Sequence, residues 1–312
     1  MLTILDYANH FGFKMIVGTS EAIKREIKTV EIDRPGLELT GFFDYHQKDR
    51  LVLLGNKEFA YIATLSDEQQ ENVFDKLCDD CVPGIVVCQN NECPRVLKNV
   101  AERKNVAIFS SSLRTCETFS DSIIYLSEQL APKTSIHACL MEIFSEGVLL
   151  MGKSGIGKSE VSLELIKKGH CLVSDDKVDI SLVRDKLIGK APALISGMME
   201  VRGIGVIDIT RMFGINSLKE SVRIRFAINL VPFTENLKVE RIGMRTEHME
   251  ILGESIPCIT LPVSPARSMA EIIEAAVTNF KLKRYGYDSA YEFEISNSCF
   301  NNFSHWSSWW NW

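Results

Sequence analysis

The sequence predicts an α/β protein, with a small N-terminal α/β domain followed by a nucleotide-binding domain that has a phosphate-binding loop and a mixed sheet. Three observations predict this fold class. Short apolar segments alternate with charged ones before residue 110, as parallel strands alternate with helices. Residues 152–159 match G-x-x-x-x-G-K-[ST], the phosphate-loop motif. Residues 222–228 alternate apolar and charged side chains, which predicts added antiparallel strands.

The N-terminal domain is predicted from its apolar and charged segments in order. Strands are expected over residues 51–54, 85–87 and 106–109, and helices over 67–78 and 94–104. Each strand is short and apolar, and each helix-compatible segment is long enough to cross between parallel strands. These elements together form one small α/β unit.

A boundary is predicted where this alternation stops. Three serines at 110–112 interrupt it, a helix is expected around residues 123–130, and residues 131–134 have the composition of a linker. We therefore expect a first domain over residues 1–132 and a second over residues 133–296. The remainder, residues 297–312, holds all four tryptophans. This Trp-rich tail is expected to stack on a neighbouring subunit, lie at a membrane interface, or fray.

The second domain is predicted to begin its nucleotide site with a strand, a loop and a helix. Residues 147–151 are apolar, residues 160–169 end in two lysines and a glycine, and residues 171–174 form another apolar strand. The loop thus precedes a helix N-terminus, where free N–H groups and the helix dipole favour anions. A further helix is expected over residues 272–280.

Composition limits the class of protein. The chain has 312 residues, 46% of them hydrophobic and 24% charged, and a formal net charge of −6, which is typical of a globular protein without general affinity for nucleic acid or anionic membranes. No segment has the features of a secretory signal, and no apolar run approaches about 18 residues, so neither export nor a membrane span is predicted. We expect a cytoplasmic protein.

Nine cysteines fit a reducing compartment. Cys78, Cys81, Cys88 and Cys93 lie close enough in sequence to suggest a zinc site as an alternative. However, Cys88 ends the apolar segment 84–88, so its side chain is expected in the core instead.

The phosphate loop carries the most specific chemistry in the sequence. Its glycines let backbone N–H groups turn toward an anion, its lysine reaches the β and γ phosphates, and its hydroxyl binds Mg²⁺. A glycine-rich turn without a ligand is the alternative. The expected nucleotide-binding residues are Gly152, Lys153, Ser154, Gly155, Ile156, Gly157, Lys158 and Ser159.

Carboxylates follow this loop at two places. Asp175 and Asp176 end the strand after the first helix, which suits a Mg²⁺-dependent phosphoryl-transfer site in which one carboxylate orients the metal and the other accepts a hydroxyl proton. A turn cap is the alternative. Glu200 and Arg202 precede two glycines, and there a Mg²⁺ ligand and an internal ion pair beside a bulge are equally consistent with the pattern.

Motifs in a fixed order extend over nearly the whole chain, and with them the sequence resembles the bacterial HPr kinase/phosphorylase family. They are RPGLELTG at 34–41, His137, GKSE at 157–160, Gly169-His170, Asp175-Asp176, EVRGIG at 200–205, ERIG at 240–243 and PVSPAR at 262–267.

The resemblance implies an enzyme that phosphorylates a regulatory serine on HPr, the small phosphocarrier protein, with ATP or pyrophosphate as donor and Mg²⁺ as cofactor. It also implies the reverse phosphorolysis, in which inorganic phosphate attacks phosphoserine and yields pyrophosphate. The family's homohexameric assembly, its response to fructose 1,6-bisphosphate and its role in carbon catabolite regulation are implied in the same way.

The resemblance also implies residue roles. Asp176 accepts the serine proton in the forward direction and returns it in reverse, as microscopic reversibility requires. Lys158 neutralises the transferring phosphoryl group, whereas Ser159 and Glu200 hold Mg²⁺. His137 holds phosphate or influences the Asp176 proton, and Arg241 binds phosphate during phosphorolysis. The expected supporting residues are Glu160, Asp175, Arg202 and Arg267.

The sequence departs from the family pattern at three positions. Ala138 stands where the family has glycine after the histidine, and Ser264 and Ala266 replace a basic residue and a glycine. These changes leave retention of phosphorolysis open. Two other readings also remain: a small-molecule kinase or carboxykinase-like enzyme, and a non-catalytic nucleotide sensor, against which the presence of Asp176 argues.

Overall fold

The computed structural model describes residues 1–233, 247–264 and 268–292. The chain divides into two compact units, Met1–Ala131 and Pro132–Trp312, one residue before the predicted boundary. Lys133 and Thr134, which were predicted to belong to a linker, already form part of a strand. Arg241, Ala266, Arg267 and the Trp-rich tail lie outside the described residues.

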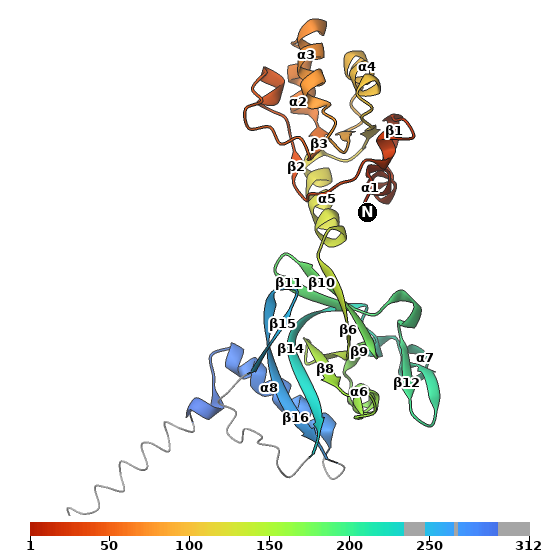
Figure 1. Cartoon of the computed structure of the whole chain (residues 1–312), viewed down its shortest axis with the longest axis vertical. Coiled ribbons are helices and arrows are strands. Elements are labelled where there is room, and N and C mark those ends of the chain that lie inside the picture. Colours follow the sequence, from red (N-terminus) through yellow and green to blue (C-terminus); the bar gives the residue numbers. More distant parts are fainter. Residues whose placement is uncertain (234–246, 265–267, 293–312) are drawn as a thin grey trace, which may run out of the picture. The chain divides into compact units, whose positions relative to one another are not determined.

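The first unit contains a five-stranded sheet in the order β1-β5-β4-β3-β2. Figure 1 labels its strands β1, β2 and β3 and the helices α1 to α5. Strands β2 to β5 are parallel, and β1 pairs antiparallel with β5. The strands are β1 Lys14–Val17, β2 Ile32–Asp33, β3 Leu51–Leu54, β4 Ile85–Val87 and β5 Ile108–Ser110; the helices are α1 Ile4–Phe11, α2 Asn56–Ile62, α3 Asp67–Leu77, α4 Arg95–Arg103 and α5 Thr115–Gln129, with short 3₁₀ turns η1 Ala22–Lys24 and η2 Glu38–Thr40.

Both faces of this sheet are buried. Alternate residues of β3 enter different core clusters: Val52 and Leu54 pack with side chains from α3 and α4, and Leu51 and Leu53 pack with side chains from α1 and α5. Burial on both faces explains why these strands are continuously apolar rather than alternating. The predicted parallel α/β domain is therefore confirmed, although β5 begins two residues later than expected.

The second unit has a mixed sheet, as predicted, and its described residues contribute nine strands to it. Its continuous path runs β6-β10-β11-β14-β8-β7-β9, and β16 adds to β14 with β15 beside it. The strands are β6 Lys133–His137, β7 Cys139–Ile143, β8 Glu146–Gly152, β9 Cys171–Ser174, β10 Lys177–Val183, β11 Lys186–Lys190, β14 Ser221–Pro232, β15 Glu247–Ile251 and β16 Glu254–Val263; the helices are α6 Lys158–Lys167, α7 Ile209–Phe213 and α8 Met269–Arg284, with 3₁₀ turns η3 Ala193–Ile195 and η4 Ile215–Ser217.

Strand β14 shows where local patterning was insufficient. Its alternation predicted antiparallel pairing, and it does pair antiparallel with β11. However, its neighbours β8 and β16 are both parallel to it. Residues 226–228, which pair with these two strands, are continuously apolar and buried, whereas burial alternates over residues 221–225 near β11.

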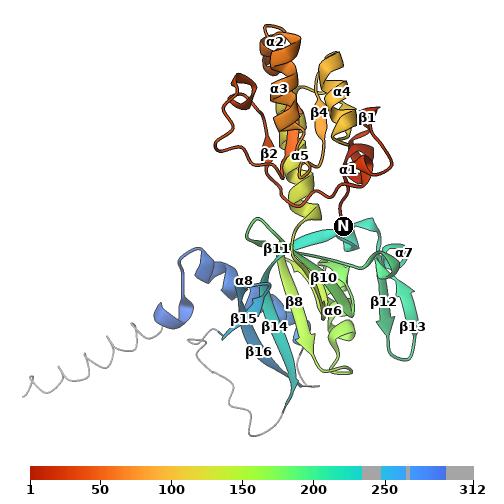
Figure 2. The same cartoon turned by 45° about the horizontal axis from the view of Figure 1, so that its top comes forward.

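A separate hairpin flanks this sheet. Figure 2 shows β12 Met198–Val201 and β13 Gly205–Asp208 as a two-stranded ribbon beside α6. Met199 and Val201 enter the same core cluster as Val161 and Leu165 of α6. The hairpin is therefore fixed against the helix that begins at the phosphate loop.

The cysteine prediction can be examined among the described residues. Cys78, Cys88 and Cys93 are buried and Cys81 is exposed. No three of these four side chains lie together as a possible metal site within the described ranges. Burial raises the pKa of the Cys93 thiol to about 11, as expected for a core residue. Among all the residues that the structure describes, no helix is long and apolar enough to cross a membrane.

Candidate active site at the phosphate loop

The loop between β8 and α6 depends on glycines in the left-handed region. Gly155 and Gly157 have φ values of +80° and +104°. A Cβ at Gly155 would lie 2.7 Å from Nη2 of Arg202, so the arginine packs directly against the loop backbone. At Gly152 a Cβ would lie 2.6 Å from the carbonyl oxygen of Leu230 on β14. These contacts explain why side chains larger than hydrogen do not fit here.

Lys158 is held by the loop itself. Its side chain is only 7% exposed, and Nζ donates hydrogen bonds to the carbonyl oxygens of Gly152 at 3.0 Å and Lys153 at 3.5 Å. The ammonium group is therefore positioned at the start of α6, where the helix dipole also favours an anion. A phosphate at this point would meet a fixed positive charge.

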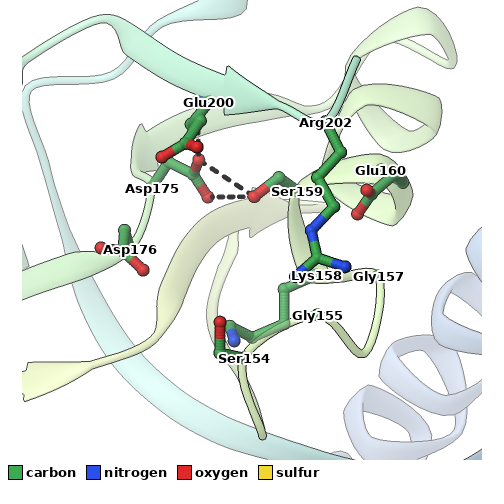
Figure 3. A pocket seen from close by; sticks show the side chains of 10 residues that line it. All are labelled: Ser154, Gly155, Gly157, Lys158, Ser159, Glu160, Asp175, Asp176, Glu200 and Arg202. Carbon is green, nitrogen blue, oxygen red and sulfur yellow. Dashed lines mark hydrogen bonds between the residues drawn. The ribbon is translucent and has the colours of Figure 1, made fainter. Parts of the chain in front are cut away.

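Asp175, which follows β9, is buried, and both of its carboxylate oxygens accept hydrogen bonds. The hydroxyl of Ser159 donates to its two oxygens at 3.0 and 3.1 Å, and the backbone N–H of Glu200 donates to Oδ2 at 3.2 Å (Figure 3). Burial raises the pKa of Asp175, and the nearby charge of Asp176 raises it further, while these hydrogen bonds act in the opposite direction. Asp175 thus joins α6 to the hairpin β12–β13.

Asp176 is adjacent in sequence but lies in a different environment. Its backbone is left-handed, with φ of +65°, and its side chain is 67% exposed. His137 at the end of β6 pairs opposite Lys177 on β10, and this register places His137 Nε2 2.9 Å from Asp176 Oδ1. The backbone N–H of Ala138 also donates to the Asp176 carbonyl oxygen.

Glu200 and Arg202 come to the site through strand alternation. Because Met199 and Val201 point into the core, the residues between and after them face the opposite side, toward the loop. Gly203 and Gly205 take positive φ values at the turn of the hairpin and do not form a bulge. Among the described residues no ion pair joins Glu200 to Arg202, and both line the same pocket. The role of Glu200 as a Mg²⁺ ligand stays a prediction.

One pocket collects these groups (Figure 3). The ten residues that line it were all predicted from the sequence: Ser154, Gly155, Gly157, Lys158, Ser159, Glu160, Asp175, Asp176, Glu200 and Arg202. Among the other predicted residues that the structure describes, the pocket lining does not include Gly152, Lys153, Ile156 and His137; Lys153 is exposed and Ile156 packs toward the core. Sequence reasoning missed the backbone N–H of Glu200 as a donor to Asp175, because no sequence pattern reveals which main-chain group meets a distant side chain.

The donor set of the pocket fits Mg²⁺. Ser159, Asp175 and Glu200 offer hard oxygen ligands, and the Ser159 hydroxyl, which donates its proton to Asp175, keeps its lone pairs free to coordinate. Lys158 and Arg202 provide positive charge for phosphate oxygens. The pocket therefore has the groups that a magnesium polyphosphate requires.

Comparisons with known proteins give consistent results. Residues 2–126 match the model described as HPr Serine kinase N terminus, and residues 128–297 match that described as HPr Serine kinase C-terminal domain. HPr kinase/phosphorylase 1 of Oceanobacillus iheyensis is 42% identical over 92% of this chain and 93% of its own length. The HPr kinase/phosphorylases of Geobacillus kaustophilus and Bacillus subtilis are 39% and 38% identical over the same shares.

Among solved structures, the Hpr(Ser) kinase/phosphatase from Coxiella burnetii matches 51% of this chain and 98% of its own length, with 36% identity and a TM-score of 0.47.

Proposed function

This chain belongs to the HPr serine kinase family, and from that membership and the geometry of the pocket we propose that it is an HPr kinase/phosphorylase. It transfers a phosphoryl group from ATP or pyrophosphate to a regulatory serine of HPr. In the reverse direction it phosphorolyses phosphoserine-HPr with inorganic phosphate.

The observation that carries this proposal is the different environment of two adjacent carboxylates in one pocket. Asp175 is 5% exposed and accepts hydrogen bonds from Ser159 and Glu200, so it orients groups that bind metal. Asp176 is exposed and touches His137, so it is accessible to a protein substrate. A small-molecule kinase would not need its base at an open surface.

In the forward direction, Asp176 accepts the proton of the substrate serine as its oxygen attacks the terminal phosphorus of the donor. The bond between that phosphorus and the bridging oxygen breaks, and ADP leaves, or inorganic phosphate when pyrophosphate is the donor. His137, 2.9 Å away, stabilises the changing charge of Asp176. Lys158 and Arg202 neutralise the charge on the phosphoryl oxygens.

In phosphorolysis, an oxygen of inorganic phosphate attacks the phosphorus of phosphoserine. The bond between phosphorus and the serine oxygen breaks, and Asp176 returns the proton to that oxygen as pyrophosphate forms. The same loop N–H groups and Lys158 suit either anion, because each presents phosphate oxygens to the start of α6.

Ser159 and Glu200 would hold Mg²⁺, with Asp175 orienting them and Glu160 supporting the same side of the pocket. When bound there, Mg²⁺ supplies charge neutralisation for the phosphoryl group. We further propose, from the family, that Arg241 and Arg267 assist phosphate binding. A homohexameric assembly, a response to fructose 1,6-bisphosphate and a cytoplasmic location belong to the same proposal.

The proposal is tested by incubating the full chain with ATP, Mg²⁺ and purified HPr, and by locating phosphoserine with mass spectrometry. Asp176→Asn should lower the rate by roughly 10²-fold or more, since general base catalysis of this kind contributes about 10²- to 10⁴-fold. Asp179→Asn is the matched control, because Asp179 lies on β10 and accepts a hydrogen bond from Ser135 away from the pocket. Its rate should be unchanged.

ATP consumption without phosphoserine on HPr would contradict the proposal and favour a small-molecule kinase. For the reverse reaction, phosphoserine-HPr and inorganic phosphate should release pyrophosphate. If they do not, while the forward reaction proceeds normally, the reverse half of the proposal is wrong.

A further inference from the structure

Three potential metal ligands converge in the first unit, in a part of the fold that the phosphoryl-transfer pocket does not use. Asp33 ends β2, Glu38 begins η2, and His46 lies in the connection between η2 and β3. One ligand atom from each side chain lies within 4.8 Å of the others. Among the described residues, no other group of three His, Cys, Asp or Glu side chains is arranged in this way.

The histidine at the centre of this group is almost completely buried and makes no hydrogen bond. Its side chain is 2% exposed, whereas those of Asp33 and Glu38 are 16% and 17% exposed. Both ring nitrogens of His46 and the Oδ2 atom of Asp33 lack a hydrogen-bond partner. Because buried polar atoms are almost always satisfied in folded proteins, these unsatisfied atoms, of which His46 Nδ1 and Asp33 Oδ2 face each other at 3.3 Å, indicate a missing partner.

The spacing of the three ligand atoms fits a coordinated metal. His46 Nδ1 lies 3.3 Å from Asp33 Oδ2 and 3.9 Å from Glu38 Oε1. Two ligands bound tetrahedrally at about 2.1 Å lie roughly 3.4 Å from each other. The observed separations lie close to this value, so an ion between the three atoms requires only small side-chain movements.

Two neighbouring arginines make their ion pairs with carboxylates outside this cluster. The guanidinium of Arg34 is bound to Glu58 at 2.9 Å, and that of Arg50 is paired with Glu31. The edge of the Phe43 ring lies against His46, with the centroids 5.4 Å apart, which fixes the plane of the imidazole. The imidazole is thus held in place, and the side chains of Arg34 and Arg50 make their ion pairs with carboxylates outside the cluster.

We propose that Asp33, Glu38 and His46 form a site for a divalent transition-metal ion, with Zn²⁺ the ion that fits best. Zn²⁺ accepts imidazole and carboxylate ligands, and a fourth position is left for water, whereas a buried imidazole disfavours Mg²⁺ and Ca²⁺. The ion fastens the segment between β2 and β3 to the end of β2. It is separate in sequence and in chemistry from the magnesium expected at the phosphate loop.

The test uses the full chain without an affinity tag, stripped with a chelator and then incubated with Zn²⁺ in the presence of excess Mg²⁺. After gel filtration, elemental analysis should find about one zinc per chain. His46→Gln should lower the affinity for zinc at least tenfold, and Glu38→Gln should also weaken zinc binding. Asp176→Asn, which alters only the other site, should retain it.

Co²⁺ in place of Zn²⁺ separates this site from the cysteines, because nitrogen and oxygen ligands give visible bands without thiolate charge transfer. Zinc should also protect residues 34–50 from proteolysis in the wild type but not in His46→Gln. The proposal is overturned if the wild type binds no zinc, if thiolate bands appear, or if both variants retain full zinc. Should His46→Gln fail to fold, Glu38→Gln decides between these outcomes.

Discussion

At the scale of single residues, burial gives two identical side chains different properties. Asp175 and Asp176 are adjacent, but only Asp175 is enclosed by Ser159 and the hairpin. A carboxylate removed from water is costly in its charged form, and that cost appears as a raised pKa. We infer that the site accepts this cost because the same enclosure orients metal-binding groups.

Replacing Asp175 should therefore stabilise the fold while lowering the activity. A raised folded-state pKa means that the contribution of Asp175 to stability is fully present below its unfolded value of 3.8 and is lost as the pH rises through the folded value. At neutral pH, Asp175→Asn removes this cost and should increase the free energy of unfolding by about 1 kcal/mol. Phosphorylation of HPr should fall sharply.

Urea denaturation without nucleotide or Mg²⁺, at several pH values, measures this effect. The difference between Asp175→Asn and the wild type should widen as the pH rises through the acid range and then remain constant. Asp179→Asn provides the control, because Asp179 is only half-buried and accepts a hydrogen bond from Ser135. A variant that is less stable than the wild type at neutral pH would show that the hydrogen bonds outweigh desolvation.

Ala138 offers a second test at this scale, because it replaces a glycine of the family pattern. Ala138 is buried and is not among the described residues with a left-handed backbone, so its methyl group causes no backbone strain. Ala138→Gly should lower the free energy of unfolding by roughly 0.5–1 kcal/mol, because glycine loses more entropy on folding. Pyrophosphate release should not rise. Faster phosphorolysis in this variant would show that the alanine limits the reverse reaction.

At the scale of elements, a buried ion-pair group joins α8 to the sheet. Glu146 of β8 accepts hydrogen bonds from Arg284 Nη1 at 2.8 and 2.9 Å, and Arg225 Nε of β14 lies 3.3 Å from its Oε2. Glu146 is only 4% exposed. Removing it leaves two guanidinium groups without their partner beside the core.

Glu146→Ala should therefore cost about 2 kcal/mol of stability, less than is typical when a fully buried ion pair loses one partner, because Arg225 and Arg284 are each 34% exposed. Lys219→Ala is a useful comparison, because Lys219 pairs with Glu142 but is 47% exposed, and its loss should cost less than about 1 kcal/mol. Chemical denaturation measures both changes. Equal losses would mean that burial does not control the strength of these pairs.

Most elements were predictable because their signals are local. Strand β8, helix α6 and strand β9, which ends just before Asp175, follow from periodicity and end signals within a few residues. The neighbours of β14 were not predictable, because pairing with β8 and β16 depends on residues far away in the sequence. Strand β6 was missed for the same reason: its edge position beside β10 leaves its residues half exposed and polar.

At the scale of the whole molecule, each compact unit has cores of its own. Among the described residues, two apolar clusters lie within the first unit and two within the second. Damage to one set of cores should therefore remain within one unit, as in proteins whose domains fold separately.

Phe74→Ala tests this expectation, because Phe74 is fully buried in a core of the first unit. Hydrogen exchange should show protection reduced by about 3–5 kcal/mol in the most protected amides of residues 1–131. Amides of the second unit and the affinity of the loop for ATP should not change. A similar loss of protection in both units would show that they unfold as one.

The α/β class, the residues of the phosphate loop and the chemistry of the pocket follow from the amino-acid sequence alone, because they depend on local spacing and on the intrinsic properties of side chains. The folded chain is needed to show which aspartate is buried, which backbone N–H binds it, and that His137 meets Asp176. It alone also brought Asp33, Glu38 and His46 together. Burial and long-range strand register decide these features, and both depend on the whole fold rather than on neighbouring residues.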